Sequence, residues 1–290
     1  MSLESILFNF NAAKSDRARD KAIPLPSGVS QCRNVRYAGH GRFGLLDVYF
    51  PDGTREALPT IVSIHGGGYV YGSKEIYRRF GMSMAQRGFA FVNFNYRLAP
   101  KFKFPTPLAD TNAVLQWVAQ NHRRYHLDPE RIILIGDSAG AQLASQYAAI
   151  FTNPAYAKYF ALNLPQVTIR ALGLYCGMYD GAARAREPRK GIFLDYLGKD
   201  LSAEDPRMQV LAAVTDKYPP TFIMSAQNDF LKAEAQPMFD FLTAKGIPAQ
   251  CKIYGSEEAS HIGHVFHVNI ILPEAVQCND DAAAFFRQYV

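Results

Sequence analysis

The chain has 290 residues, of which 48% are hydrophobic and 20% are charged, a composition typical of a soluble globular protein that buries a substantial core. Its net charge of +5 comes from 31 basic and 26 acidic residues, and acidic residues interrupt the basic clusters, which argues against a nucleic-acid-binding protein. Because the chain begins without a signal-peptide pattern and no apolar run approaches the roughly 20 residues that cross a membrane, we expect a cytoplasmic protein without nucleic-acid or membrane partners.

In chain order, a first segment of residues 1–33 carries a short apolar patch and then becomes charged. After it, short β-rich runs alternate with patterns typical of helices. Several runs consist of β-branched or aromatic residues, as expected for strands that are buried on both faces. We predict strands at 34–38, 45–50, 60–65, 89–95, 131–136, 170–176, 220–226 and 249–254, and helices at roughly 74–87, 107–124, 139–151, 233–245 and 274–289.

This alternation predicts a single α/β domain over residues 1–290. We expect a mostly parallel eight-stranded sheet with helices on both faces and two antiparallel strands at one edge. Functional residues in such sheets gather where the carboxyl ends of the strands meet. The segment 1–33 and the insertion 181–219 are candidates for a small cap over that edge, although the apolar part of the insertion is equally typical of a short helix packed on the core.

The first candidate motif is the sequence HGGGY at residues 65–69, directly after the predicted strand 60–65. It lacks the spacing of a phosphate-binding loop. Glycine lets a backbone approach a substrate closely, so the loop can instead form an oxyanion hole with the amides of Gly67 and Gly68. We expect His65 to anchor this loop rather than to act as a base.

The second candidate motif is the sequence GDSAG at residues 136–140, between the predicted strand 131–136 and a helix rich in small residues. A serine at this position can simply cap the helix. The G-x-S-x-G spacing in a strand–turn–helix context, however, is typical of a nucleophile, here Ser138. The amide of Ala139, directly after it, is a third candidate oxyanion donor.

A serine nucleophile needs a base and an acid that orients the base. Asp229 follows the predicted strand 220–226 and is the candidate acid, although it can also cap the next helix. Three histidines, His261, His264 and His267, follow the last predicted strand. A metal site is an alternative for them, but neither helical nor strand geometry brings all of them together and no zinc motif supports it. One of these histidines is therefore expected to be the base.

The motifs HGGGY, NYRLAP, GDSAG, NDFL and GHVF, in this order, resemble those of the α/β-hydrolase carboxylesterases related to hormone-sensitive lipase. The resemblance covers about residues 45–290 and is closest to small bacterial feruloyl or acetyl-xylan esterase-like enzymes. It implies an α/β-hydrolase fold with His264 as the base, within a His-Val-Phe element, and Asp229 as the acid. It also implies that His261 and His267 have no catalytic role. The segment before the sheet is shorter here than in relatives with a large helical cap.

These observations predict a serine carboxylesterase that acts on small soluble esters without a metal or cofactor. Its triad would be Ser138, Asp229 and His264. An amide hydrolase with the same triad and a non-catalytic binding module are the alternatives. Because the candidate caps are small, we expect acyl groups of roughly two to six carbons, with aromatic acyl groups possible. Candidate pocket residues are Tyr69, Tyr71 and Phe230.

Overall fold

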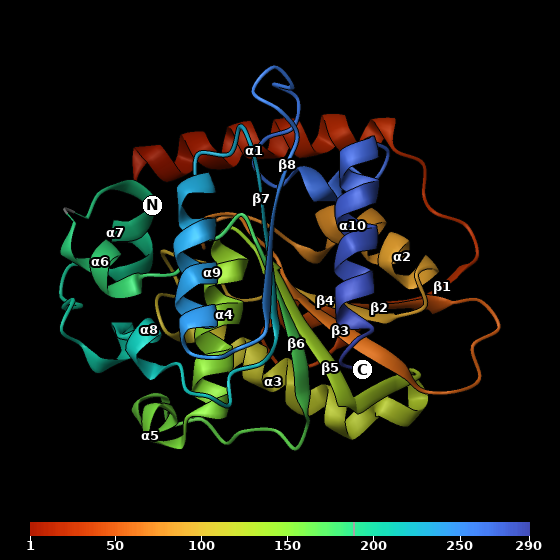
Figure 1. Ribbon diagram of the computed structural model, residues 1–290, viewed down its shortest axis with the longest axis horizontal. Helices are drawn as coiled ribbons and strands as arrows, with labels where there is room; N and C mark the ends of the chain where they lie inside the picture. The colour runs from red at the N-terminus through yellow and green to blue at the C-terminus, as the bar shows by residue number, and fades with distance from the viewer. Residues whose placement is uncertain (188) are drawn as a thin grey trace.

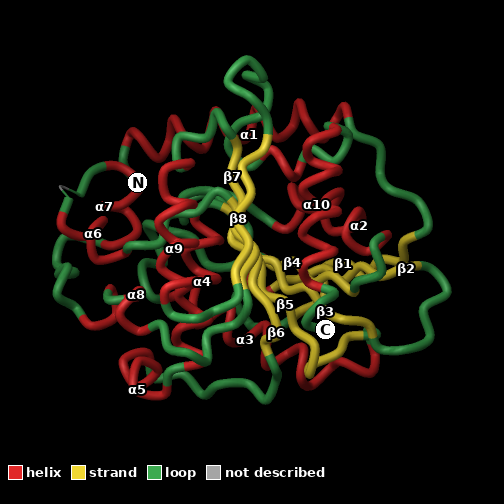
Figure 2. The backbone as a smooth tube through the Cα atoms, viewed as in Figure 1, coloured by secondary structure: helices red, strands yellow, loops and turns green. Residues whose placement is uncertain are grey.

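The computed structural model describes residues 1–187 and 189–290 and contains one central sheet, drawn in yellow in Figure 2. Its strands are β1 (Val29–Arg36), β2 (Leu45–Pro51), β3 (Leu58–Ile64), β4 (Ala90–Phe94), β5 (Leu127–Asp137), β6 (Ile169–Tyr175), β7 (Thr221–Ala226) and β8 (Ala249–Tyr254). They lie in the order β1-β2-β4-β3-β5-β6-β7-β8. The pairs β1–β2 and β2–β4 are antiparallel and the others are parallel. This confirms the predicted eight-stranded, mostly parallel sheet with its antiparallel edge.

Helices flank this sheet. The α-helices are α1 (Leu3–Ala22), α2 (Arg78–Gln86), α3 (Thr106–Asn121), α4 (Ala139–Thr152), α5 (Pro154–Ala157), α6 (Gly181–Arg186), α7 (Gly191–Leu197), α8 (Val210–Ala213), α9 (Ala235–Ala244) and α10 (Pro273–Phe286). The 3₁₀-helices are η1 (Gly41–Gly44), η2 (Lys74–Tyr77), η3 (His122–Arg124), η4 (Lys158–Phe160), η5 (Pro206–Met208), η6 (Lys232–Glu234) and η7 (Phe266–Val268). Within the described ranges, none of the helices has the length and apolarity needed to span a membrane.

The two faces of the sheet bury separate hydrophobic cores. Residues of α3, α4 and α9 belong to one core, and residues of α2 and α10 belong to the other. Figure 1 shows these two sets of helices on opposite sides of the strands. Side chains on both faces of the sheet are therefore covered, which is why β4 and β7 are buried along their whole length and are mostly apolar in sequence.

The first strand is longer than predicted. It begins at Val29, whereas the sequence pattern indicated residues 34–38. β1 is an edge strand, and Val29 is the only buried residue among its eight, the others being partly buried or exposed. Residues 30–34 are mostly polar, so they show neither the apolar alternation nor the apolar run by which a strand is recognised in a sequence.

The N-terminal segment forms a helix that the sequence did not predict. α1 runs for 20 residues, and the Ser2 hydroxyl caps it by accepting a hydrogen bond from the Ser5 amide at 3.2 Å. The apolar side chains do not form one buried stripe, because Leu3, Leu7 and Phe10 are exposed. The periodicity that identifies a core-facing helix is thus missing. α1 lies across the top of the molecule in Figure 1.

A buried ion pair joins the antiparallel edge of the sheet to η2. The Lys74 ammonium lies 2.8 Å from Oδ1 of Asp47 in β2, and both side chains are completely buried. The Asn34 side chain accepts a further hydrogen bond from Lys74 at 2.8 Å. The Tyr49 hydroxyl donates to Oδ2 of Asp47 at 2.9 Å. These contacts compensate the buried charges and fix the chain segment that follows the HGGGY loop.

Replacing Lys74 by Met should lower the free energy of unfolding by about 3–5 kcal/mol, because the buried Asp47 would lose its closest cation and keep only the partly exposed Arg33, whose Nε lies 3.5 Å away. Urea unfolding measures this. The double variant Lys74→Met/Asp47→Leu should recover much of the loss, since no buried charge remains. The matched control is Asp280→Asn, which breaks an exposed ion pair to Arg87 and should cost less than about 1 kcal/mol. If Lys74→Met and Asp280→Asn lowered the free energy of unfolding equally, the Lys74–Asp47 pair would not have the stabilising role described.

Candidate active site

The serine of the GDSAG sequence lies at the sharp turn between β5 and α4. Ser138 has φ 52° and ψ −118°, a conformation rare for residues other than glycine. A Cβ atom on Gly136 would lie 2.2 Å from the carbonyl oxygen of Gly140, and one on Gly140 would lie 2.0 Å from that of Ile64. Both positions therefore require glycine. The close approach explains the G-x-S-x-G spacing and holds Ser138 at the N-terminus of α4.

The glycine-rich loop begins where β3 ends and lines the same cavity as Ser138. Gly67 and Gly68 have φ values of 110° and 57°. A Cβ atom on Gly67 would lie 2.3 Å from the carbonyl oxygen of Tyr71, so the loop folds back on itself in a way that only glycine permits. Ala139 lines this cavity as well. The predicted oxyanion donors are thus gathered around one space.

His65 anchors the base of this loop. Its ring stacks on Tyr96 with the centroids 4.1 Å apart, and its Nδ1 lies 2.7 Å from the carbonyl oxygen of Gly66. The Tyr96 hydroxyl donates to the carbonyl oxygen of His65 at 3.1 Å. Burial lowers the pKa of His65 to about 4, so this imidazole is neutral at pH 7 and packs as part of the core.

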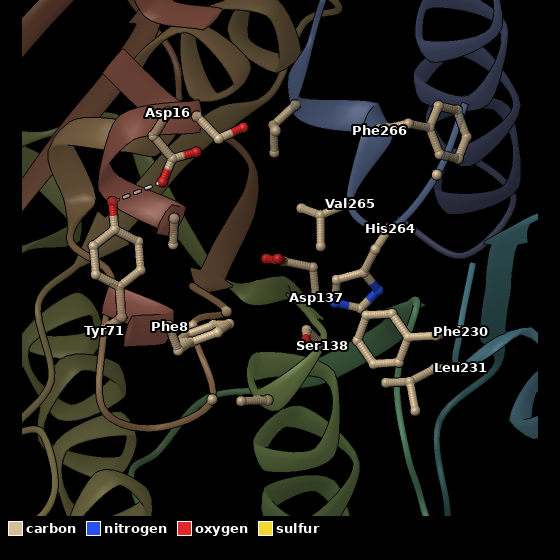
Figure 3. Close-up of a pocket in the computed structure, with 18 of the residues that line it drawn as sticks. Phe8, Asp16, Tyr71, Asp137, Ser138, Phe230, Leu231, His264, Val265 and Phe266 are labelled. Atoms are coloured by element: carbon tan, nitrogen blue, oxygen red, sulfur yellow. Dashed lines mark hydrogen bonds between the residues drawn. The ribbon is translucent and has the colours of Figure 1, made fainter. Parts of the chain in front are cut away.

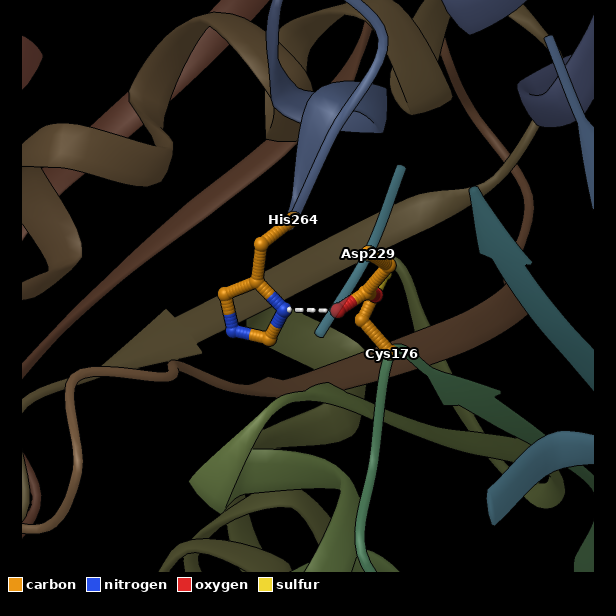
Figure 4. A group of neighbouring side chains, drawn as sticks. All are labelled: Cys176, Asp229 and His264. Atoms are coloured by element: carbon orange, nitrogen blue, oxygen red, sulfur yellow. Dashed lines mark hydrogen bonds and ion pairs between the residues drawn. The ribbon is translucent and has the colours of Figure 1, made fainter. Parts of the chain in front are cut away.

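Asp229 and His264 form a hydrogen-bonded pair, shown in Figure 4. Nδ1 of His264 lies 2.9 Å from Oδ1 of Asp229, and the carboxylate is completely buried. The Leu231 amide donates to Oδ1 at 2.8 Å, and the Ser225 hydroxyl donates to Oδ2 at 2.8 Å. Burial alone would raise the pKa of Asp229. Hydrogen bonds and charge from His264, together with the Cys176 thiol and the Leu231 amide, outweigh burial and hold the pKa below its ordinary value.

The three clustered histidines have three different surroundings. His264 is partly exposed and lines the cavity, whereas His261 is exposed at its rim. His267 is buried between the rings of Phe80 and Tyr175, with both centroid distances at 4.9 Å. Burial lowers the pKa of His267 to about 3. The histidines therefore do not converge on one point.

A different trio is close enough to share a metal ion. Among the described residues, Cys176, Asp229 and His264 place their ligand atoms within 4.8 Å of one another. Burial raises the pKa of Cys176 well above its ordinary value, and the Asp229 carboxylate raises it further. Cys176 is thus a neutral thiol beside the carboxylate, and its Sγ lies 4.0 Å from Sδ of Met224. The Asp229 carboxylate already accepts hydrogen bonds from His264, Ser225 and Leu231. These donors explain the cluster as a carboxylate that orients His264, rather than as a metal centre.

The side chains surround a cavity of about 770 Å³, part of which is shown in Figure 3. The predicted pocket residues Tyr69, Tyr71 and Phe230 all line it. Phe230 is 77% exposed, and its ring centroid lies 4.4 Å from that of His264. Tyr69 is instead buried and stacks on Tyr196 at 3.7 Å. Phe230 therefore flanks the histidine at the entrance, whereas Tyr69 supports the wall.

Several charged cavity residues were not found by sequence reasoning, although the two segments that carry them were candidate caps. Phe8, Asp16 and Arg19 reach it from α1, and Asp16 accepts hydrogen bonds from the Tyr71 hydroxyl at 2.8 Å and from Arg19 at 2.8 Å. Arg184, Glu187, Ile192 and Phe193 reach it from the insertion 181–219. Both candidate cap segments thus contribute side chains. The segment 1–33 was a candidate cap, but none of its charged residues was assigned to the site, because nothing local in the sequence indicates the cavity that they line.

Asp137 was also missed, although it lies inside the GDSAG motif. Its side chain is buried and accepts a hydrogen bond from the Tyr77 hydroxyl at 2.6 Å. Tyr77 lies 60 residues away in the chain, so only the folded chain shows the pair. Both residues line the cavity.

Comparison with known proteins shows similarity to esterases. The carboxylesterase NlhH of Mycobacterium tuberculosis is 28% identical over 311 residues, which cover 99% of this chain and 94% of that protein. The acetyl esterase of Salmonella paratyphi A is 28% identical over 286 residues, covering 94% and 81%. The crystal structure of inhibited esterase B from Lactobacillus rhamnosis superposes with a TM-score of 0.86 at 26% identity, covering 96% of this chain and 93% of that one.

The family profile described as alpha/beta hydrolase fold matches residues 61–267. This range contains the glycine-rich loop, the turn at Ser138, Asp229 and His264. It also contains most of the sheet, which is eight-stranded and mostly parallel as predicted from the sequence. The chain therefore belongs to the alpha/beta hydrolase fold family, and its predicted fold class is confirmed.

Proposed function

We propose that this protein is a serine carboxylesterase that hydrolyses small esters. The observation that carries this proposal is that Ser138, at its constrained turn, and His264, hydrogen-bonded to the buried Asp229, line one cavity. A hydroxyl, an imidazole and a carboxylate in one site are the groups that acyl transfer requires. The similarity to a carboxylesterase and an acetyl esterase over most of the chain supports ester substrates.

In the proposed reaction, the Ser138 hydroxyl attacks the ester carbonyl while Nε2 of His264 takes its proton. Nδ1 of His264 faces Asp229, so the carboxylate holds the ring in this tautomer and stabilises the imidazolium that forms. The amides of Gly67, Gly68 and Ala139 stabilise the negative oxygen of the tetrahedral intermediate. His264 then protonates the leaving alcohol and activates the water that releases the acid. The reaction needs no cofactor.

The charged groups in the cavity wall favour short acyl chains. Asp16 and Arg19 project from α1, and Arg184, Glu187 and Glu234 lie among the other lining residues. A long alkyl chain would cover such groups and remove water from them without offering a hydrogen bond. The cavity is larger than the small caps suggested, but its charged walls support the same preference for roughly two to six carbons.

We also propose that the protein works in a reducing compartment, the cytoplasm. Its four cysteines, Cys32, Cys176, Cys251 and Cys278, are free. Burial raises the pKa of each of them, which keeps them as unreactive thiols.

Replacing Ser138 by Ala should abolish hydrolysis of an aryl ester such as 4-nitrophenyl acetate, because the loss of a triad member costs several orders of magnitude. Thermal unfolding should change little, since only a partly exposed hydroxyl is removed. Mass spectrometry should find a fluorophosphonate bound to Ser138 in the parent protein and not in the variant. Activity within about tenfold of the parent would reject Ser138 as the nucleophile.

His264→Ala should be as damaging to kcat as Ser138→Ala, because His264 is the proposed base that takes the proton of Ser138 and is held by Asp229. The matched control is His261→Ala, which removes an exposed imidazole three residues away at the cavity rim and should retain most turnover. His267 is unsuitable as a control, because its loss would leave a cavity between Phe80 and Tyr175. An inactive His261→Ala variant beside an active His264→Ala variant would reassign the base.

Acyl selectivity is tested with 4-nitrophenyl esters of increasing acyl length at concentrations below their aggregation limit. We expect kcat/KM to be highest between two and about six carbons and to fall beyond that length, because longer chains meet the charged wall. Turnover of the matching anilides should be much slower. A kcat/KM that rises to twelve carbons, or anilides cleaved as fast as esters, would contradict the proposed substrate class.

A further inference from the structure

A buried chain of hydrogen bonds links the glycine-rich loop to the turn that carries Ser138. The Gly66 amide donates to the Tyr77 hydroxyl oxygen at 3.0 Å, and that hydroxyl donates to Oδ2 of Asp137 at 2.6 Å. Tyr77 is 5% exposed and Asp137 is 2% exposed. Three separate segments are thus connected: the loop after β3, the 3₁₀-helix η2 and the end of β5.

The contact between the loop and the carboxylate is close. A Cβ atom on Gly66 would lie 2.6 Å from Oδ2 of Asp137 and 2.9 Å from its carbonyl oxygen. The Gly66 backbone therefore rests directly on Asp137. The next residue along the loop is Gly67, a proposed oxyanion donor, and the residue after Asp137 is Ser138. Each end of the chain of hydrogen bonds lies one peptide unit from a group proposed to act in the reaction.

We propose that Tyr77 and Asp137 are positioning residues that hold the oxyanion loop in the correct place relative to Ser138. This inference rests on the proposed function of the site. The oxyanion donors stabilise charge only where they meet the developing negative oxygen, so a displacement of the loop by a fraction of an ångström weakens them. Neither side chain exchanges a proton with the substrate. Both act through the backbone of the Gly66–Gly67 segment.

The direction of the hydrogen bonds depends on the charge of Asp137. As a carboxylate, Asp137 only accepts, so the Tyr77 hydroxyl must donate to it and keeps its oxygen free for the Gly66 amide. A protonated Asp137 can instead donate to the Tyr77 oxygen, and it then competes with the Gly66 amide for that oxygen. The loop is therefore held most firmly when Asp137 is ionised.

The groups around Asp137 place the ionisation of its carboxyl near neutral pH. Burial raises the pKa of Asp137 to about 7, against the lowering effects of the Tyr77 hydrogen bond, the nearby His264 and the Gly66 amide, while Asp16 raises it. These groups face Asp137 from η2, the loop after β8, the glycine-rich loop and α1. Because the folded protein binds this proton more tightly than the unfolded chain, stability falls as the pH rises from about 4 to about 7.

The first test compares Tyr77→Phe with Tyr147→Phe. The control removes another buried tyrosine hydroxyl, which donates to Oδ1 of Asn112 at 2.9 Å. Neither Tyr147 nor Asn112 lines the cavity. Tyr77→Phe should lower kcat by roughly ten- to hundredfold and leave KM within about twofold of the parent. Tyr147→Phe should change neither. A kcat for Tyr77→Phe that matches the Tyr147→Phe value would overturn the proposal.

The second test uses Asp137→Asn, which keeps an acceptor for the Tyr77 hydroxyl but does not titrate. The ratio of kcat in the parent to kcat in the variant should rise from near one at pH 5.5 to about tenfold at pH 8.5. Dividing the two kcat values removes only the part of the pH dependence that both proteins share. Over the same pH range the variant should gain stability relative to the parent in urea unfolding, because it avoids the buried charge. A ratio that is constant with pH would overturn the role of the charge.

A third measurement does not depend on hydrolysis. Amide hydrogen exchange should show the Gly66 amide protected in the parent and in Ser138→Ala, but exchanging at least tenfold faster in Tyr77→Phe. If the parent hydrolyses no ester yet Gly66 behaves in this way, the proposed function fails and the positioning contact stands. If esters are hydrolysed and Gly66 exchange is unchanged in Tyr77→Phe, the positioning contact fails alone.

Discussion

The close packing of Gly140 against the carbonyl oxygen of Ile64 is the constraint on which the site depends. The two residues come from α4 and β3, and no side-chain atom fits between them. This contact sets the first turn of α4 beside the end of β3, from which the glycine-rich loop departs. The parallel pairing of β3 with β5, with Ile64 opposite Gly136, ends both strands at the same level. Nucleophile and oxyanion loop are therefore neighbours as a result of backbone packing.

Two buried aspartates near this point have pKa values that are shifted in opposite directions. Asp229 lies among donors, including His264 and the Cys176 thiol, so its pKa falls despite burial. Asp137 has fewer donors, so burial dominates and its pKa rises to about 7. The first remains ionised at neutral pH and can orient an imidazole. The second is poised between two charge states, which suits a group that adjusts the geometry of a neighbouring loop.

The cover of the cavity is built from two segments far apart in the sequence. α1 reaches it from the N-terminal end of the chain, and the insertion between β6 and β7 reaches it from the other side. The amide of Ser2 and its hydroxyl both donate to Asp195 of α7, at 2.7 and 3.0 Å. Arg19, near the other end of α1, donates to the carbonyl oxygen of Ile76 at 2.8 Å. Polar contacts at both ends thus hold a helix whose apolar side chains pack only in part.

The sequence alone determined the parts of this protein that depend on local chemistry. Continuous apolar runs predicted the buried strands, and the glycines around Ser138 predicted the sharp turn, because only glycine tolerates such close backbone contact. The tertiary structure decided what depends on distant residues meeting. It placed His264 against Asp229 and separated it from His261 and His267. It also brought α1 over the cavity and joined Tyr77 to Asp137 across 60 residues. Such contacts leave no periodic signal, since a hydrogen bond constrains positions in space and not their spacing along the chain.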